Sequence, residues 1–358
     1  MFQNLTTGVI IATISAIIFL ILAIPKLREY IDTKFPQDIL IVCVWLLFFI
    51  FSLLQALAYL FLSEELFRFS YIIISCNAIL LLVFIDYITN ESINTIRFTF
   101  MIGLFVGTMI SIFFPNSSYK AFYPNGNLGI FIGGYFRILF SITFGIMILI
   151  FIYYSSKIYI KAPHKLKIPS AFFLLGVITF SIVPLIVTLL NITSIIPAFH
   201  LLWMGIGAII IGIAYIKEPK IAYILPFKVI KLAVVEIKRG ISLFTYDWTK
   251  KEELSEQATF SAMIHAVGKF IEENLKWGGI REIFLDKANL ILKKNEKYPI
   301  ICVLVSNKTS RSLRNALYCF TNRFVKEYSQ YFSNPTDIDK YKAASEIISG
   351  CFSFVPEY

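Results

Sequence analysis

Residues 39–62 read ILIVCVWLLFFIFSLLQALAYLFL and contain no charged side chain. A helix needs about 20 mostly apolar residues to cross the hydrocarbon core of a bilayer, so this run is long enough for one crossing. Over the whole chain of 358 residues, 57% of the side chains are hydrophobic and only 16% are charged. This composition lies outside the range of soluble globular proteins and predicts an integral membrane protein.

Similar apolar runs recur up to residue 216, with charged or turn-rich segments between them. We interpret them as seven transmembrane helices, of which the second and third have the least distinct boundary. The expected helices span 7–25, 39–62, 67–88, 96–114, 129–154, 169–190 and 197–216. The fold class predicted for this half is therefore a membrane α-helical bundle.

The pattern changes at Lys217, after which charged and apolar residues alternate as in a water-soluble fold. The expected parts are a transmembrane domain at 1–216, a juxtamembrane linker at 217–228, a soluble domain at 229–350 and a C-terminal tail at 351–358. The net charge of the chain is +10, and its basic soluble part would be attracted to anionic lipid headgroups. Zinc-finger spacings, RNP-like motifs and long basic runs are absent from the sequence, so nucleic acid is not an expected partner.

Basic residues in the loops predict the orientation of the bundle, because they remain mostly on the cytoplasmic side. With seven helices, one set of loops contains Lys26, Arg28, Lys34, Arg97, Lys157, Lys161, Lys165 and Lys167. The opposite set contains only Arg68 and Lys120. We therefore expect a multi-pass protein of the cell membrane with its N-terminus outside and its C-terminal domain in the cytoplasm.

Catalytic and metal-binding signatures are missing from the sequence. It has no HExxH or GxSxG motif, and its three histidines are scattered. We therefore expect no enzyme activity, no cofactor and no metal site. The five cysteines form no CxxC pair and are expected to be buried, reduced thiols. They are Cys43, Cys76, Cys302, Cys319 and Cys351.

Charged side chains within the apolar runs are the strongest pointers to a function, because an Arg in mid-membrane costs at least about 2.5 kcal/mol unless it is paired or hydrated. Arg137 is expected about two turns into the fifth helix from the outside, and His200 about one turn into the seventh. Together with polar groups at the outer ends of the second and third helices, they predict an outward-facing cavity for an anionic or zwitterionic ligand. The candidate ligand-binding residues are Glu64, Glu65, Arg68, Arg137, His200 and Trp203.

A simpler interpretation of the same residues stays open. Arg137 could extend its side chain to the headgroups, as long basic side chains do. Glu64 and Glu65 could lie in the solvated headgroup region, and His200 could be a hydrogen-bonded residue at the interface. On this interpretation the bundle has no ligand cavity.

The C-terminal part shows alternating patterns of strands and helices. The expected strands span 229–238, 241–246, 280–286, 289–293 and 300–305, and the expected helices span about 254–275, 310–332 and 337–348. The fifth strand, IICVLV, is uniformly apolar and is expected to be central and buried on both faces. The predicted order is two strands, a helix, three strands and two helices, in an antiparallel-rich sheet.

This order, with the hairpin IKRGISLF at 237–244 and the turn GGIREIFL at 278–285, resembles longin domains. It is also similar to the related roadblock fold, which has an extra helix before its first strand. Such domains generally bind small GTPases or peptide segments through the sheet edge and the first helix. The resemblance implies a partner-binding face with Glu252, Glu256, Lys269 and Glu273, although these residues could equally be the solvated side of an amphipathic helix.

The membrane half is similar in layout to the seven-helix sensor regions that precede histidine kinases in archaea and bacteria. This sequence departs from the kinases after the last helix, where it has neither a dimerisation helix pair with a phosphorylatable His nor Gly-rich ATP-lid motifs. We therefore expect a receptor or scaffold in which seven helices respond to a ligand, lipid or partner and the longin-like domain binds a cytoplasmic protein such as a small GTPase. The alternative is a transporter or channel with a regulatory cytoplasmic domain.

Overall fold

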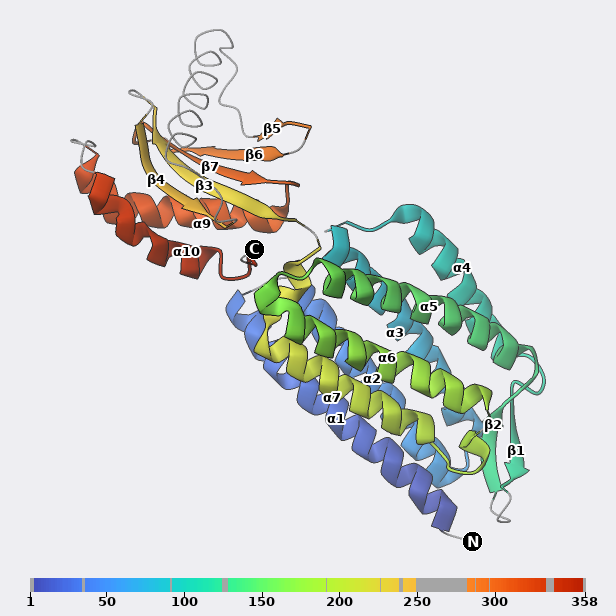
Figure 1. The fold of residues 1–358 in the computed structure, drawn as a ribbon. Coiled ribbons are helices and arrows are strands. Elements are labelled where there is room, and N and C mark those ends of the chain that lie inside the picture. Colours follow the sequence, from blue (N-terminus) through green and yellow to red (C-terminus); the bar gives the residue numbers. More distant parts are fainter. Residues whose placement is uncertain are drawn as a thin grey trace. The chain divides into compact units, whose positions relative to one another are not determined.

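The computed structural model describes residues 3–33, 36–90, 92–123, 128–190, 192–225, 227–237, 241–248, 282–286, 288–295, 297–332 and 338–356. They form two compact units, a helical unit that ends at Ile221 and an α/β unit that follows it (Figure 1). Each unit is described by itself.

The helical unit contains long apolar helices. They are α1 (Gln3–Thr33), α2 (Pro36–Phe61), α3 (Glu64–Asn90), α4 (Thr95–Ser111), α5 (Gly134–Lys161), α6 (Lys167–Leu189) and α7 (Phe199–Lys217). Six of these, all except α4, are long and apolar enough to cross a membrane. The chain is therefore a multi-pass membrane protein, as the composition predicts. Helix α4 has 17 residues and ends before the expected boundary at residue 114.

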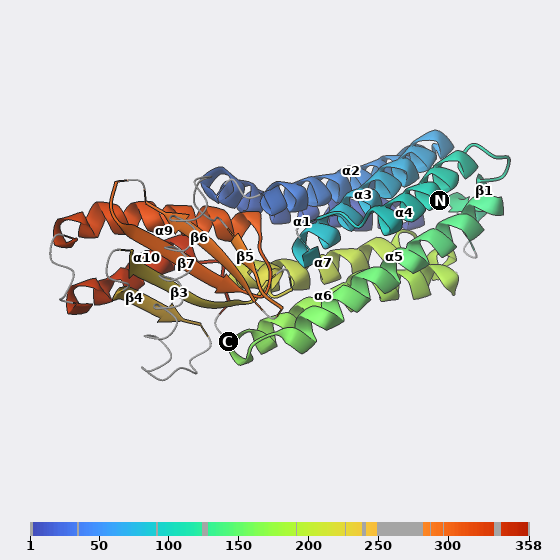
Figure 2. The same ribbon diagram turned by 90° about the horizontal axis from the view of Figure 1, so that it is seen from above.

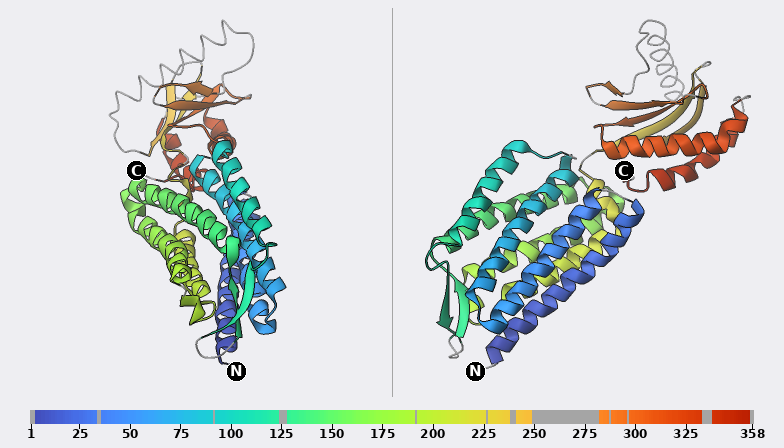
Figure 3. Two further views of the ribbon diagram at one scale, coloured as in Figure 1. Left: turned by 90° about the vertical axis from the view of Figure 1, so that its right-hand side faces the viewer. Right: turned by 180° about the vertical axis from the view of Figure 1, so that it is seen from behind.

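Helices α6 and α7 pack closely because glycines, which have no side chain, lie at their interface. A Cβ atom on Gly207 would lie 2.4 Å from the backbone nitrogen of Phe180, and one on Gly176 would lie 2.8 Å from that of Ile211. Small residues allow this kind of approach in membrane bundles, where burial of apolar surface gives no net driving force between helices. Figures 2 and 3 show α2 and α3 on one side of the bundle and α5 and α6 on the other.

An ion pair joins α3 to the start of α4. Asp86 is fully buried, and its carboxylate pairs with the Arg97 guanidinium and accepts a hydrogen bond from the backbone N–H of Asn94 (3.0 Å). Arg97 also donates to the hydroxyl of Tyr154 on α5 (2.5 Å). Arg97, which the sequence places in an inner loop, thus lies in the first turn of α4 and holds three helices together.

A short hairpin precedes α5, where the sequence predicts helix from residue 129. Strand β1 (Ser118–Phe122) pairs antiparallel with β2 (Leu128–Ile132), and the helix begins only at Gly134. A Cβ on Gly129 would lie 2.3 Å from the ring of Tyr123, so glycine is what allows this ring to lie against the hairpin. Gly134 itself has a φ of +55°, which favours glycine. The predicted boundary of the fifth helix is therefore wrong at its start.

The α/β unit has a five-stranded sheet in the order β4-β3-β7-β6-β5, and every pairing is antiparallel. The strands are β3 (Val229–Glu236), β4 (Ile241–Asp247), β5 (Glu282–Phe284), β6 (Asn289–Lys294) and β7 (Ile300–Ser306), and the helices after them are α9 (Arg311–Tyr328) and α10 (Ser345–Cys351). Strand β7 is central and its residues Cys302, Val303 and Leu304 are fully buried, as predicted. The helix expected at 254–275 lies outside the described residues.

The C-terminal residues pack into the α/β unit. Cys319 on α9 and Cys351 on α10 form a disulfide, which corrects the prediction that all five cysteines are reduced. Cys76 is exposed rather than buried. Phe352 packs against Trp248 and Phe320, so the segment expected as a tail begins inside the core of this unit. Wide sequence separation concealed the disulfide, because the two cysteines are 32 residues apart in the chain.

Candidate functional site

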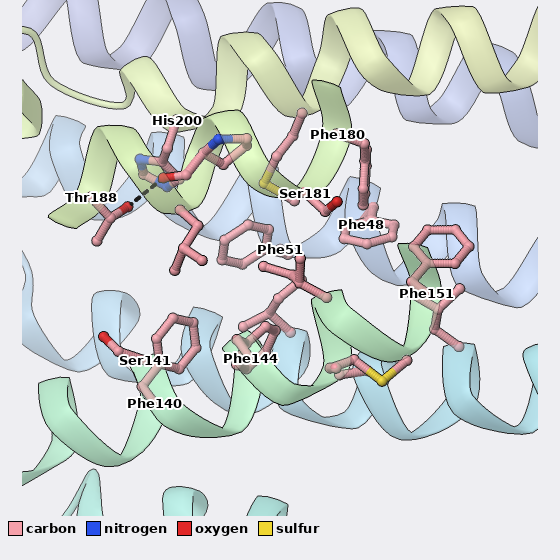
Figure 4. Close-up of a pocket in the computed structure, with 18 of the residues that line it drawn as sticks. Phe48, Phe51, Phe140, Ser141, Phe144, Phe151, Phe180, Ser181, Thr188 and His200 are labelled. Carbon is pink, nitrogen blue, oxygen red and sulfur yellow. Dashed lines mark hydrogen bonds between the residues drawn. The ribbon is translucent and has the colours of Figure 1, made fainter. Parts of the chain in front are cut away.

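An apolar cavity of about 130 Å³, here called the chamber, lies between α2, α3, α5, α6 and α7 (Figure 4). Six phenylalanines from three helices face it: Phe48, Phe51, Phe140, Phe144, Phe151 and Phe180. A cavity of about 150 Å³ with similar walls stays dry and takes a benzene-sized apolar group. The chamber is therefore suited to hydrocarbon rather than to water.

The hydroxyl groups in the chamber wall bond to the backbone of their own helices. Ser141 donates to the carbonyl of Arg137 (2.8 Å), and Ser181 donates to that of Val177 (2.5 Å). Thr188 donates to the carbonyl of Pro184 (2.9 Å), the bond drawn as a dashed line in Figure 4. Because these donors are occupied, the chamber offers a ligand few polar contacts.

A second cavity of about 40 Å³, here called the vestibule, adjoins the chamber, since Tyr71, Thr188 and His200 line both. Its other lining residues are Tyr59, Phe67, Tyr119, Tyr123, Ile130, Phe131, Ile132, Arg137 and Thr193. The hairpin β1–β2 supplies five of these side chains. The described residues of the vestibule lining supply one guanidinium, several hydroxyls, one imidazole and no carboxylate, a set of groups that suits an anion.

Among the described residues that line the vestibule, Arg137 is the only Lys or Arg. It lies in the first turn of α5 and not two turns inside the helix, because the preceding residues form the hairpin. Its side chain is partly buried, and within the described ranges it makes no ion pair or side-chain hydrogen bond. The positive end of the α5 dipole adds to its charge rather than offsetting it. The guanidinium is thus available to an external anion.

His200 lies where the two cavities meet, in the first turn of α7 and closer to the helix start than expected. Its Nδ1 atom is buried and has no hydrogen-bond partner in the described part of the chain. An unsatisfied buried nitrogen lowers the stability of the protein by about 1–3 kcal/mol. A ligand group that forms a hydrogen bond with this nitrogen would remove that penalty.

Four tyrosines line the vestibule: Tyr59 on α2, Tyr71 on α3, Tyr119 on β1 and Tyr123 after β1. Burial raises the pKa of Tyr123 to about 12, so its hydroxyl remains protonated and can donate a hydrogen bond at neutral pH. Sequence reasoning missed these residues, because tyrosines near helix ends are ordinary in membrane proteins and mark the interface.

Two of the predicted site residues instead hold the hairpin to α3. Glu64 pairs with Arg68 (3.6 Å) and accepts a hydrogen bond from the hydroxyl of Ser118 on β1 (3.1 Å). Arg68 Nε donates to the same hydroxyl (2.8 Å). Neither lines the chamber or the vestibule, so their role is to position the hairpin that forms one wall of the vestibule.

The remaining predicted residues lie away from this site. Glu65 is exposed in the first turn of α3. Trp203 packs edge-on against Phe199 and lines neither the chamber nor the vestibule. The proposed partner-binding residues Glu252, Glu256, Lys269 and Glu273 lie outside the described residues.

Comparison with protein-family models, curated proteins and solved structures finds no match for this chain. The chemistry of the cavities is therefore the basis for a function.

Proposed function

We propose that this chain is a membrane receptor that binds a small anionic ligand in the vestibule and chamber of its helical unit. The observation that carries the proposal concerns the described residues. Among them, the Arg137 guanidinium has no internal partner, the Nδ1 atom of His200 is unsatisfied, and the vestibule lining contains no carboxylate. A guanidinium presents a planar fork of donors that matches carboxylate and phosphate groups. The simpler interpretation, in which His200 is a hydrogen-bonded residue at the interface, does not account for the Nδ1 atom.

Seven crossings, with the N-terminus outside and the C-terminus in the cytoplasm, belong to this proposal. The position of α4 supports the count. Its first turn is bonded to Asp86 of α3, and the hairpin that follows it is bonded to Glu64 at the opposite end of α3. These two residues are about 33 Å apart along a helix with a rise of 1.5 Å per residue. That distance matches the roughly 30 Å hydrocarbon core, so α4 would cross the membrane despite its length.

A longin-like α/β unit that binds a small GTPase or another cytoplasmic protein is the output that we propose. The described strands and the two C-terminal helices follow the predicted element order, which supports the resemblance. Charge reversal at Glu252 and Glu256 in the full chain should then abolish binding of a purified small GTPase, while Glu346→Lys at an exposed position of α10 should not. Unchanged binding of the GTPase by the Glu252 and Glu256 variants would show that this face is not the binding site.

A transporter is the competing class, and an experiment in sealed liposomes separates it from a receptor. Radiolabelled glycerol 3-phosphate would be added outside liposomes that contain the full chain. We expect saturable binding at the membrane without accumulation inside, because the chamber beyond the vestibule is apolar and offers no hydrated path. Protein-dependent accumulation in the lumen would contradict the receptor proposal.

A further inference from the structure

Three cavities lie in a row through the helical unit. The vestibule adjoins the chamber at Tyr71 and His200, and the chamber adjoins a third cavity of about 30 Å³ at Phe48 and Phe151. The third cavity is lined entirely by apolar and aromatic side chains. The row therefore begins with a cation and hydroxyl groups and continues with hydrocarbon and aromatic rings.

We infer that the ligand is a single-chain amphiphile whose anionic head binds at Arg137 and whose acyl chain extends through the chamber. This inference rests on the proposed ligand-binding function and specifies its ligand class. A carboxylate head, as in a free fatty acid, and a phosphate head, as in a lysophosphatidate, share the chemistry that the vestibule recognises.

The polarity of the row supports an amphiphile over a small polar anion. An anion without a chain would satisfy the vestibule but leave the chamber empty, and unfilled apolar space forfeits packing contacts. A neutral hydrocarbon would fill the chamber but leave the Arg137 charge and the Nδ1 atom of His200 without partners. Only a molecule with both parts satisfies both ends.

The dimensions of the row support one chain rather than two. Arg137 and Phe151 lie on the same helix, about 21 Å apart at a rise of 1.5 Å per residue, so the row is long and narrow. The volume of the chamber is close to that of a cavity that accepts one benzene-sized group. Two acyl chains side by side would not fit in this volume, so the row favours a single-chain amphiphile over an ordinary two-chain membrane lipid.

The test measures binding to the full chain in phosphatidylcholine nanodiscs, with all probes kept below their micelle-forming concentrations. Saturated fatty acids of increasing length, lysophosphatidate, lysophosphatidylcholine and an uncharged monoacylglycerol are the probes. We expect affinity for the fatty acids to rise with chain length and then level off once the row is full. We also expect lysophosphatidate to bind more tightly than lysophosphatidylcholine and monoacylglycerol.

Two variants test the two ends separately. Arg137→Gln should weaken binding of the anionic probes by about tenfold or more, because a charge-assisted contact is lost, and should leave monoacylglycerol unaffected. Lys120→Gln, which removes an exposed charge from the hairpin, is its control and should change nothing. Ala78→Leu narrows the chamber and should lower the affinity for long-chain probes more than for short ones. Ala171→Leu, outside the cavities, should not change these affinities.

The outcomes separate the inference from the function on which it rests. Short anions that bind as tightly as long-chain ones, with the same dependence on Arg137, would reject the amphiphile and leave a receptor for a small anion. Equal binding of the anionic probes by Arg137→Gln and the parent would show that the anionic head does not bind at Arg137. Failure of every probe, including glycerol 3-phosphate, to bind the full chain would reject both the amphiphile and the proposed receptor function. Competition between fatty acid and lysophosphatidate then identifies which head the site prefers.

Discussion

Two arginines in the helical unit show how differently the same charge can be used. Arg97 is bonded to a fully buried aspartate, and Arg137 has no partner in the described part of the chain. Removing one member of a buried ion pair leaves the other charge unpaired in a medium of low dielectric, which is destabilising. Removing a charge that is already unpaired instead removes its desolvation penalty. The two residues therefore predict opposite effects on the stability of the empty protein.

Arg137→Gln should leave the melting temperature of the ligand-free protein unchanged or slightly raise it, because no internal contact is lost. The same variant should lose the stabilisation that an anionic ligand gives the parent. Thermal unfolding of the purified protein in nanodiscs, with and without lysophosphatidate, measures both effects. A drop of several degrees in the empty variant would mean that Arg137 has a structural partner.

Arg97→Gln should destabilise the helical unit by about 3–5 kcal/mol, since it leaves the Asp86 carboxylate buried and unpaired. The double variant Arg97→Gln/Asp86→Asn should recover part of this loss, because the uncompensated charge is then removed. Denaturant unfolding of the parent, both single variants and the double variant gives the coupling between the two residues. Additive effects would show that the pair does not contribute to stability.

Two of the predicted site residues were chosen because a charge or an imidazole interrupts an apolar run. Arg137 and His200 were selected on that ground, and the structure brings both to the vestibule. Glu64 and Arg68 gave the same signal but hold the hairpin, because sequence alone cannot tell a charge that pairs with its neighbour one turn away from one that does not. The tyrosines of the vestibule give no signal, since their residue type is common at helix ends.

The hairpin β1–β2 is the element that the sequence concealed. Its second strand, LGIFI, is apolar and directly precedes an apolar helix, and a short apolar run fits either structure. The two glycines at 133 and 134 mark the change, but glycine is also frequent within membrane helices. Among the described elements, the five strands and helices α2, α3, α6, α7 and α9 were predicted within a few residues of their observed bounds, because length and alternation distinguish them. The helix predicted at 254–275 lies outside the described residues.

Gly129→Ala tests whether the hairpin positions Tyr123 in the vestibule. The new methyl group would lie 2.3 Å from the Tyr123 ring, which must move, and the ring can do so by rotating away from the site. We expect anionic ligands to bind several-fold more weakly, with only a small change in melting temperature. Gly103→Ala in α4 is the matched control, because nothing lies within 4 Å of its added Cβ; it should keep binding and raise stability by up to about 1 kcal/mol. Unchanged ligand affinity in Gly129→Ala would show that Tyr123 is not part of the site.

At the scale of the whole molecule, two observations point to different compartments for the α/β unit. The basic residues in the loops favour the cytoplasm. The disulfide Cys319–Cys351 is of a kind that persists mainly in oxidising compartments. The number of crossings bears on the same question, because with seven crossings the two ends of the chain lie on opposite sides, and with six they lie on the same side.

Labelling of single cysteines in intact cells decides both questions. The positions are Glu65 at the start of α3, Lys120 on the hairpin, Lys165 between α5 and α6, and Glu346 on α10, all of which are exposed, unlike the buried Ser118 nearby. If α4 crosses the membrane, Glu65 and Lys120 are on the same side, and we expect an impermeant reagent to reach both from outside. Lys165 and Glu346 should react only after permeabilisation. Glu65 and Lys120 on opposite sides would mean six crossings, and the reverse of the whole pattern would place the α/β unit outside, where the disulfide would be expected to persist.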